Sequence, residues 1–333
     1  MAETKTTIAV DAAGGDYAPQ EVVKGAIRGG EEYGVNIILV GKKAILHVLA
    51  ARYLKQDWLT IVEANEVIEF NEHPMRAVVS KPNSSIVVGV NLVKQGVAQA
   101  FMSAGHTGAM FGASMMILGK KDGIERPAIC AVLDITGSTP VVLIDVGANA
   151  DCKPHYLVQF AEMGIAFARR VLGVKSPRVA LLNIGEEDTK GNRLAQDSFV
   201  LLKDSGLNFI GNVEGHDLSK RKADVVVTDG FTGNIVLKTL EGMGDVIQNI
   251  RELGNAGTKN VRGRALLHLV GIDSWARRMD YREYGGACLL GVNGNIIIAH
   301  GRSRAGAIKN AIGLAKQTVE GKISDTIEEE RHE

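Results

Sequence analysis

"DVVVTDGFTGNIVLK" (residues 224–238) joins an apolar run to a stretch with helical spacing through a loop rich in glycine. The three consecutive valines, Val225 to Val227, are typical of a strand buried on both faces of a parallel sheet. Glycines allow a backbone to approach a ligand closely, and a helix N-terminus presents free N–H groups to an anion. An ordinary strand-to-helix turn has the same composition, so this loop alone leaves both interpretations open.

The same arrangement recurs along the chain. Other short apolar runs also end in glycine or small polar residues: "TIAVDAAGGD", "NIILVG", "LTIVEA", "AFMSAGHTG", "VVLIDVGANAD", "RVALLNIGEED" and "NFIGNVEG". Helix-like patterns lie between them at residues 19–33, 84–95, 154–172, 194–203 and 304–319. This alternation predicts an α/β sandwich with a mostly parallel sheet. Ligands of open α/β sheets bind outside the carboxyl ends of the strands, so the repeated loops favour one shared site.

Residues 240–284 differ from this pattern, because they lack clear strand signals over a long stretch. We expect a helical excursion from a single catalytic domain that spans residues 1–333, with two helices joined at "GNAGTKNVRG". The charged tail "KISDTIEEERHE" is expected to be solvated or frayed.

Composition limits the classes of protein that fit. The 333 residues are 45% hydrophobic and 23% charged, which is typical of a soluble globular protein. Lysine plus arginine equals aspartate plus glutamate at 38 each, so the chain has no net positive charge that would attract nucleic acid. An acidic partner would have to bind a local patch of basic residues. We found no signal peptide, apolar run of membrane-spanning length or lipidation motif. Three separated cysteines also fit a cytoplasmic protein, with membrane contact limited to a peripheral one.

Several common chemistries lack their sequence motifs. "DAAGGD" stands where a GxGxxG would follow the first strand, and GxxxxGK[ST], HExxH and GxSxG are absent. We therefore expect neither a cofactor nor a metal. The absence of a nucleophile elbow favours a reaction in which the protein positions two substrates and stabilises charge.

Candidate site residues follow from the loops. Lys190, in "GEEDTKGN", could bind a phosphate or oxyanion, or be a solvated surface lysine. Asn234 could donate its amide to an anion or cap a helix, and Asp229 could orient a donor or simply form the turn. His106 of "SAGHTGA" could act as an acid or base, although a lone histidine is more often structural. Asn149 of "DVGANADCKP" has helix capping as its alternative role.

Together these loops resemble the bacterial phosphate acyltransferases, which convert acyl-acyl carrier protein and inorganic phosphate into acyl phosphate. The resemblance runs over nearly the whole chain, in family order, through "DAAGGDYAP", "KPNSSI", "SAGHTGA", "ERPA", "DVGANADCKP", "LLNIGEEDTKGN", "FIGNVEG", "VVVTDGFTGNIVLKTLEG" and "YGGACLLGVNG". It implies a three-layer αβα fold related to phosphate acetyltransferases and the isocitrate and isopropylmalate dehydrogenases, assembled as a homodimer. Each motif alone is weak, but their ordered agreement is specific.

The resemblance also implies roles for residues. Lys190, Asn234 and Asp229 are the expected catalytic residues. The expected substrate-binding residues are Gly14, Gly15, Asp16, Ser103, His106, Thr107, Asn149, Gly230, Thr232 and Gly233. Three positions depart from the family pattern, which often has methionine at Ala13, asparagine at His106 and a small residue at Arg302. The departure at His106 argues against an invariant role in proton transfer.

The implied reaction belongs to an early step of bacterial phospholipid synthesis, upstream of a glycerol-3-phosphate acyltransferase. Since acyl carrier protein is acidic, it needs a basic docking surface. Residues 258–284 combine six basic side chains with apolar ones, so they are expected to pack in a dimer and to touch carrier protein or a membrane at their tip. The alternatives are a phosphate acyltransferase for short-chain acyl-CoA, a dehydrogenase of the related fold and a non-catalytic scaffold for lipid synthesis.

Overall fold

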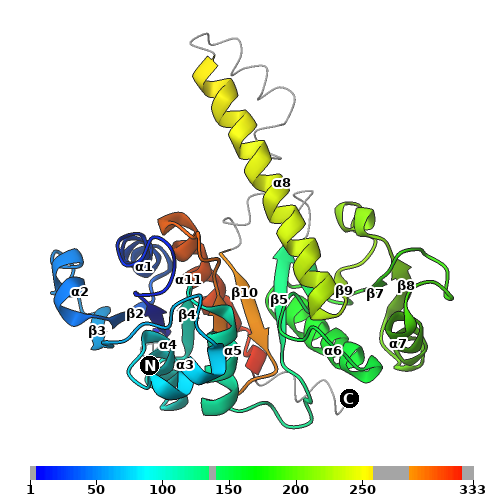
Figure 1. Ribbon diagram of the computed structural model, residues 1–333, viewed down its shortest axis with the longest axis horizontal. Coiled ribbons are helices and arrows are strands. Elements are labelled where there is room, and N and C mark those ends of the chain that lie inside the picture. The colour runs from blue at the N-terminus through cyan, green and yellow to red at the C-terminus, as the bar shows by residue number, and fades with distance from the viewer. Residues whose placement is uncertain (1–4, 135–139, 258–284, 325–333) are drawn as a thin grey trace. The chain divides into compact units, whose positions relative to one another are not determined.

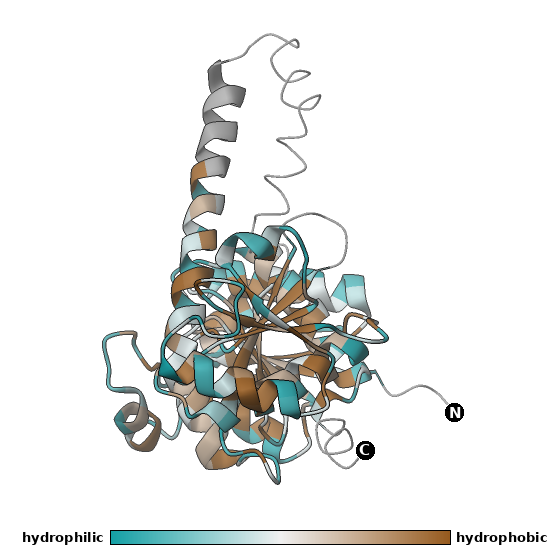
Figure 2. Ribbon diagram, turned by 90° about the vertical axis from the view of Figure 1, so that its right-hand side faces the viewer, coloured by the Kyte–Doolittle hydropathy of each residue, from teal (hydrophilic) through white to brown (hydrophobic). Residues whose placement is uncertain are grey.

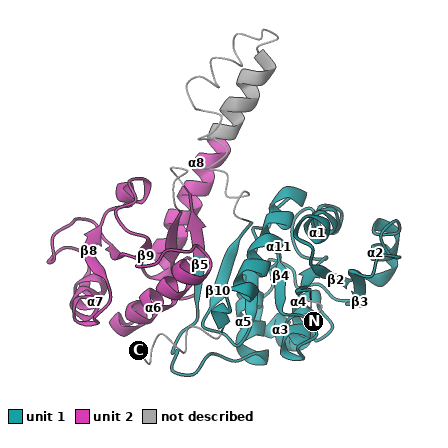
Figure 3. Ribbon diagram, turned by 180° about the vertical axis from the view of Figure 1, so that it is seen from behind, with its two compact units in different colours: residues 1–130, 284–333 teal, residues 131–283 magenta. Residues whose placement is uncertain are grey.

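The computed structural model describes residues 5–134, 140–257 and 285–324, with side chains described up to residue 246 in the helix that ends at Gly257. The chain forms two compact units, and each is described by itself (Figure 3). Unit 1 comprises residues 1–130 and 284–333, and unit 2 comprises residues 131–283. The single catalytic domain expected from the sequence stays a prediction, because a division into two compact units does not show which residues act together in catalysis.

Unit 1 carries six strands in the order β3-β2-β1-β4-β11-β10 within its described residues. They are β1 (Thr7–Asp11), β2 (Asn36–Gly41), β3 (Leu59–Glu63), β4 (Ala100–Ser103), β10 (Ala287–Leu290) and β11 (Asn295–Ile298). The pairs from β3 to β11 are parallel, whereas β10 and β11 form an antiparallel pair. Ile8, Ala9 and Val10 of β1 are fully buried, as expected for a strand covered on both faces.

Helices lie on both faces of this sheet (Figure 1). They are α1 (Gln20–Tyr33), α2 (Lys43–Leu49), α3 (Pro74–Ser80), α4 (Ser85–Lys94), α5 (Thr107–Ile117) and α11 (Ala305–Glu320). The pair α1 and α11 packs closely because Gly25 of α1 faces Ala305 and Ile308 of α11, where an added Cβ would lie 2.6 Å from their atoms. A residue without a side chain is therefore required at this crossing.

Unit 2 has the parallel strand order β6-β9-β7-β8. Its strands are β6 (Val141–Ile144), β7 (Val179–Leu182), β8 (Phe209–Val213) and β9 (Val225–Val227), while β5 (Ala128–Leu133) crosses the boundary between the units. The helices are α6 (Pro154–Arg170), α7 (Arg193–Asp204), the 3-10 turn η1 (Gly215–Ser219) and α8 (Gly230–Gly257). In Figure 2 the strands are mainly brown and the helices mix brown with teal, which matches a buried sheet under amphipathic helices.

The expected helical excursion begins inside α8, which continues without a break from Gly230 to Gly257. Most of the expected joint, and the basic and apolar segment 258–284, lie outside the described residues, as does most of the charged tail. Within the described chain, no helix combines the length and the apolar character that crossing a bilayer requires.

The predicted mostly parallel α/β fold is confirmed. The five helices expected from periodicity are α1, α4, α6, α7 and α11, and their observed ends differ from the expected ones by at most two residues. The sequence interpretation missed β5 and the antiparallel pair β10 and β11. A short, continuously apolar run cannot be distinguished from a buried helix segment by periodicity alone.

Candidate active site

The residues expected at the site fall into two groups, one in each unit. Gly14, Gly15, Asp16, Ser103, His106 and Thr107 belong to unit 1. Asn149, Lys190, Asp229, Gly230, Thr232, Gly233 and Asn234 belong to unit 2. In both units the residues lie at the ends of strands, in the loops after them or in the helix turns that follow, as expected for ligand sites of α/β sheets.

In unit 1, a buried carboxylate at the end of β1 organises the glycine loop. Asp11 is 1% exposed, and its Oδ1 accepts hydrogen bonds from the backbone N–H groups of Ala13 and Gly14, both at 3.0 Å. Its Oδ2 accepts one from the hydroxyl of Ser103 at 2.6 Å. Burial raises the pKa of Asp11, although the hydrogen bonds from Ser103 and Ser85 oppose this rise. The hydroxyl of Ser103 is therefore committed to holding the two loops together.

Gly14 and Gly15 fit this loop for steric reasons. A Cβ on Gly14 would clash with the carboxylate of Asp11 and lie 2.8 Å from the nitrogen of Gly105. Gly15 has a φ of 109°, which a residue with a side chain rarely adopts. Asp16 is exposed, and its backbone N–H donates to the carbonyl of Gly301 at 2.8 Å.

His106 caps helix α5. Its Nδ1 accepts a hydrogen bond from the N–H of Gly108 at 3.2 Å, so the Nε2–H donates to the carbonyl of Glu72 at 3.1 Å. The ring also stacks on Phe70, with 6.3 Å between centroids. Both ring nitrogens are thus engaged within the protein, which favours the structural role over acid–base catalysis. Thr107, the first residue of α5, is exposed.

In unit 2, a second buried carboxylate, Asp145, organises the loop after β6 in the same way. Its Oδ1 accepts from the N–H groups of Gly147 and Ala148 at 3.2 and 3.0 Å. Its Oδ2 accepts from the backbone and the side-chain amide of Asn149, at 2.7 and 2.9 Å. The amide donor of Asn149 therefore stabilises this loop, and Asn149 itself is only 8% exposed.

The first turn of α8 packs against this loop. Asp229 accepts hydrogen bonds from the N–H and the hydroxyl of Thr232, both at 2.8 Å, and so caps the helix. The N–H of Gly230 donates to the carbonyl of Asn149 at 2.7 Å, and a Cβ there would lie 2.7 Å from this oxygen. A Cβ on Gly233 would clash with the carbonyl of Asp145. Both glycines are therefore required by close packing, and their N–H groups are already engaged.

Asn234 lies in the first turns of α8 and is exposed. Because the helix starts at Gly230, Asn234 is not its cap, and this alternative is excluded. Among the described residues, none hydrogen-bonds its side-chain amide. It lies beside Gly147 of the β6 loop, whose ideal Cβ position is 3.7 Å from the amide carbon and oxygen of Asn234. The amide is thus free to donate to a ligand.

Lys190 lies in the loop between β7 and α7. Asn183, directly after β7, fixes this loop by donating from its side chain to the carbonyl of Lys190 at 3.0 Å. The ammonium group of Lys190 is 4.0 Å from a carboxylate oxygen of Glu187, and the two side chains are 50% and 66% exposed. Such an exposed pair is weak, so the ammonium can pair with an anionic ligand instead.

A pocket of about 390 Å³ connects the Lys190 loop to the start of α8. Gly191 and Asn192, which directly follow Lys190, line it on one side, and Asp229 and Thr232 line it on the other. Asn234 lies two residues after Thr232, on the opposite face of the helix. The pocket therefore brings together the surroundings of Lys190 and Asp229, but not the side chain of Asn234.

Cys152 is a neighbour of this region that the sequence interpretation did not select. Its thiol donates to the carbonyl of Asn149 at 3.5 Å. Burial, reinforced by the carboxylates of Asp145 and Asp229, raises the pKa of Cys152 to about 12. The group is therefore a neutral thiol near pH 7 and is a poor nucleophile.

Another cluster, Glu214, His216 and Asp217, has the geometry of a candidate cation site, and its ligand atoms lie within 4.8 Å of one another. The carboxylate of Asp217 is buried and already pairs with Lys220 and Lys222, at 3.1 and 3.0 Å. These two ammonium groups compensate the acidic charge, so the cluster is explained without a cation.

Comparison with solved structures supports the fold. The chain resembles the EutD phosphotransacetylase from Staphylococcus aureus, with a TM-score of 0.61 and 15% identity over 95% of this chain and 94% of that one. It also resembles the 4-hydroxythreonine-4-phosphate dehydrogenase from Klebsiella pneumoniae, with a TM-score of 0.55 and 13% identity over 96% and 100% of the two chains. At these identities the likeness shows the fold alone, and it confirms the predicted similarity in fold to phosphate acetyltransferases.

Comparison of sequences is more specific. Residues 6–325 match the family described as "Fatty acid synthesis protein". A phosphate acyltransferase from Dehalococcoides mccartyi is 55% identical over 97% of this chain and 94% of its own. Another from Desulforamulus reducens is 48% identical, with 97% and 96% covered. This protein therefore belongs to the phosphate acyltransferase family of fatty acid synthesis proteins.

Proposed function

We propose that this enzyme transfers a long acyl chain from acyl carrier protein to inorganic phosphate and so forms acyl phosphate, an early intermediate of phospholipid synthesis. The observation that carries the proposal is the 55% identity to a phosphate acyltransferase over 97% of the chain. The name of that relative specifies neither the thiol carrier nor the length of the acyl chain. These two assignments rest on the motif resemblance and on the pocket beside the Lys190 loop.

The proposed chemistry is an acyl transfer without a covalent enzyme intermediate. An oxygen of hydrogen phosphate attacks the thioester carbonyl carbon, and the carbonyl oxygen becomes a tetrahedral oxyanion. This intermediate collapses as the carbon–sulfur bond breaks, and the departing thiolate takes up the proton that phosphate carried. Phosphate is largely anionic near neutral pH, so a strong general base is not required. The neutral thiol of Cys152 is consistent with this route.

In this scheme the protein contributes positioning and electrostatics. The ammonium of Lys190 binds phosphate, replacing its weak pairing with Glu187. The side-chain amide of Asn234, which has no hydrogen-bond partner among the described residues, donates to the oxyanion. The N–H groups of Gly230, Thr232 and Gly233 already donate to acceptors within the protein. The ligand donors are therefore assigned to side chains rather than to these three amides.

The expected partners of the enzyme are acyl carrier protein, a second copy of the chain and the acyltransferase that uses the acyl phosphate. We place carrier-protein or peripheral membrane contact in residues 258–284, which lie outside the described residues, and the enzyme in the cytoplasm. Liposome sedimentation tests the membrane contact with Leu266→Glu plus Leu269→Glu. Unchanged binding by this double variant would reject the contact.

The decisive experiment follows two products of one reaction. Purified enzyme is mixed with hexadecanoyl-acyl carrier protein, with and without phosphate, and the free carrier thiol and hydroxylamine-trapped acyl phosphate are measured. Both products in equal amount, and only with phosphate, support the proposal. Equal or better activity with butanoyl-CoA would favour the short-chain alternative. Binding of the carrier protein without either product would favour the scaffold.

A further inference from the structure

The pocket of about 390 Å³ in unit 2 has mainly hydrocarbon walls. Four elements supply them: α6, β7, α7 and α8 contribute Leu157, Leu181, Leu182, Leu194, Ala195 and Val236. Leu157 and Leu181 are each 1% exposed and form the deep end. Ile184, which also lines the pocket, is 78% exposed and extends this apolar surface to solvent. The volume lies within the range of about 300–1,000 Å³ for small-molecule sites and is far larger than phosphate alone requires.

The charge of the lining limits what the pocket can bind. Among the described residues that line it, Asp229 is the one titratable residue, and none is a lysine, arginine or histidine. An anionic ligand would therefore lose its hydration, find no positive charge in the lining and be repelled by the carboxylate of Asp229. A neutral hydrocarbon chain carries no charge to be desolvated or repelled. Filling such walls with methylene groups is favourable by the hydrophobic effect.

The position of the pocket relates it to the expected chemistry. Its polar side is formed by Thr228, Asp229 and Thr232 at the end of β9 and the start of α8, and by Asn192 beside Lys190. A chain in the pocket would thus have its apolar part among the leucines and its polar head beside the Lys190 loop, at the start of α8. We propose that this pocket binds the hydrocarbon chain of the transferred acyl group. This assignment rests on the proposed function.

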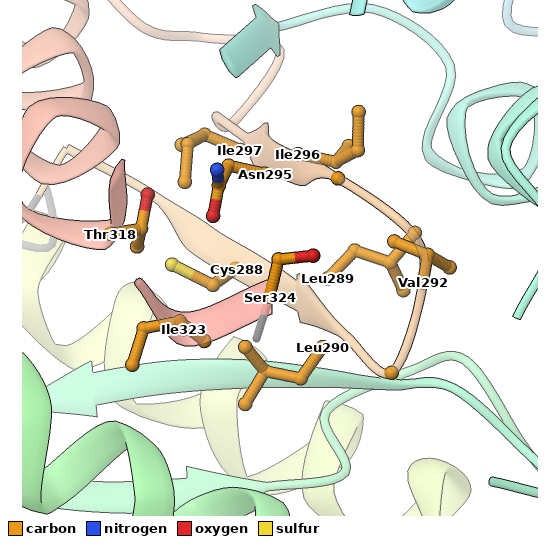
Figure 4. A pocket seen from close by; sticks show the side chains of 12 residues that line it. Cys288, Leu289, Leu290, Val292, Asn295, Ile296, Ile297, Thr318, Ile323 and Ser324 are labelled. Atoms are coloured by element: carbon orange, nitrogen blue, oxygen red, sulfur yellow. The ribbon is translucent and has the colours of Figure 1, made fainter. Parts of the chain in front are cut away.

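A second pocket, in unit 1, is also apolar but does not compete for this role. Figure 4 shows its lining by Cys288 and Leu290 of β10, Ile297 of β11 and Ile323, among others. Its volume of about 10 Å³ is close to the space that a single water molecule occupies. It cannot hold several methylene groups.

Chain-length dependence tests the proposal. Ala195→Trp fills part of the pocket, so we expect kcat/KM for hexadecanoyl-acyl carrier protein to fall by about tenfold or more, the loss that follows from excluding only two methylene groups. The value for butanoyl-acyl carrier protein should stay within about threefold, because a short chain does not reach the added indole. Val200→Trp, on the same helix at a position that is 56% exposed and outside the pocket, is the matched control.

A second variant guards against misfolding. Ile184→Glu changes an exposed side chain at the mouth, so its folding should be unaffected, while its charge opposes entry of a hydrocarbon chain. We expect a higher KM for the long-chain substrate and an unchanged melting temperature. Equal loss for long and short chains in both variants, or no loss in either, would overturn the assignment.

Photolabelling gives a result that does not depend on activity. Hexadecanoyl-pantetheine with a diazirine at its last carbon is irradiated with the wild-type enzyme, and the labelled peptides are mapped. Labelling of residues 181–195 or 228–236 supports the pocket, and labelling confined to other segments rejects it. An enzyme that forms acyl phosphate but is labelled elsewhere retains the proposed function and loses this subsite. Labelling here without acyl phosphate formation would keep the subsite and reject the function.

Discussion

Asp229 accepts two hydrogen bonds from one residue, Thr232, whose backbone N–H and hydroxyl both lie 2.8 Å from its carboxylate oxygens. This contact closes the first turn of α8 and also forms the polar side of the 390 Å³ pocket. Asp229 thus has a structural role as a helix cap, whether or not it also has a catalytic role. The two roles can be separated by substitution, since asparagine retains the cap and removes the charge.

We expect Asp229→Ala to lower the free energy of unfolding by about 1 kcal/mol, the usual cost of losing a helix cap. Asp229→Asn should keep nearly all of this stability. Chemical denaturation measures both effects. If Asp229→Asn is stable but slow in acyl phosphate formation, the carboxylate charge contributes to catalysis. Full activity of this variant would reduce Asp229 to its structural role.

We expect Asn234→Ala to reduce kcat by about 10²–10³, equivalent to about 3 kcal/mol, because it removes a donor to the tetrahedral oxyanion. Its melting temperature should not change, since the side chain is exposed. Steady-state kinetics at saturating phosphate measure the effect. The adjacent Ile235→Ala, at a position that is 51% exposed, is the control. A loss that is similar in both variants would contradict the assigned role.

Lys190→Ala should raise the KM for phosphate by tenfold or more, because an ammonium–phosphate contact contributes about 1.5–3 kcal/mol. The melting temperature should stay constant, since the pair with Glu187 is exposed and weak. Lys203→Ala is a suitable control: that lysine is 64% exposed and pairs with Asp188 at 3.3 Å. If KM for phosphate is unchanged in Lys190→Ala, phosphate binds elsewhere.

The packing of α1 against α11 predicts that replacing glycine by alanine changes stability in opposite directions at Gly25 and Gly306. Gly25→Ala should destabilise unit 1 by about 1–3 kcal/mol, because its Cβ would meet α11 at 2.6 Å. Gly306→Ala places its Cβ in open space within α11, so it should stabilise the protein by about 0.5–1 kcal/mol. Thermal unfolding of both variants checks the signs. Two variants with the same sign would contradict this packing.

Asp217 predicts a pH dependence of stability at low pH. Burial alone would raise the pKa of this carboxyl, but hydrogen bonds from Lys222 and Lys220 outweigh it and hold the pKa at about 2, below the ordinary value of 3.8. The carboxylate therefore stabilises the fold above about pH 4, and this contribution is lost as the pH falls towards 2. Asp217→Asn should be less stable than the wild type at pH 6, and the difference should shrink between pH 4 and pH 2. A difference that is constant over this range would contradict the assignment.

Local patterns in the sequence determined most of the secondary structure. Runs such as Val225 to Val227 and the helical periodicity at residues 154–172 depend on neighbours within a few positions, and the observed elements follow them. The ordered motifs also identified the family, which the 55% identity to a relative confirms. The strands β5, β10 and β11 were missed because their apolar residues have no distinctive local period.

Only the tertiary structure decided which groups meet. His106 could be an acid, a base or a structural residue on paper, and its contacts with Gly108 and Glu72 make it a helix cap. Asp11 and Ser103 are far apart in the sequence and 2.6 Å apart in the fold. The apolar pocket beside Lys190 is built from four elements and appears in no single stretch of sequence. Periodicity reports whether a side chain is buried, whereas its partners depend on strand order and helix packing, which are set by contacts between distant residues.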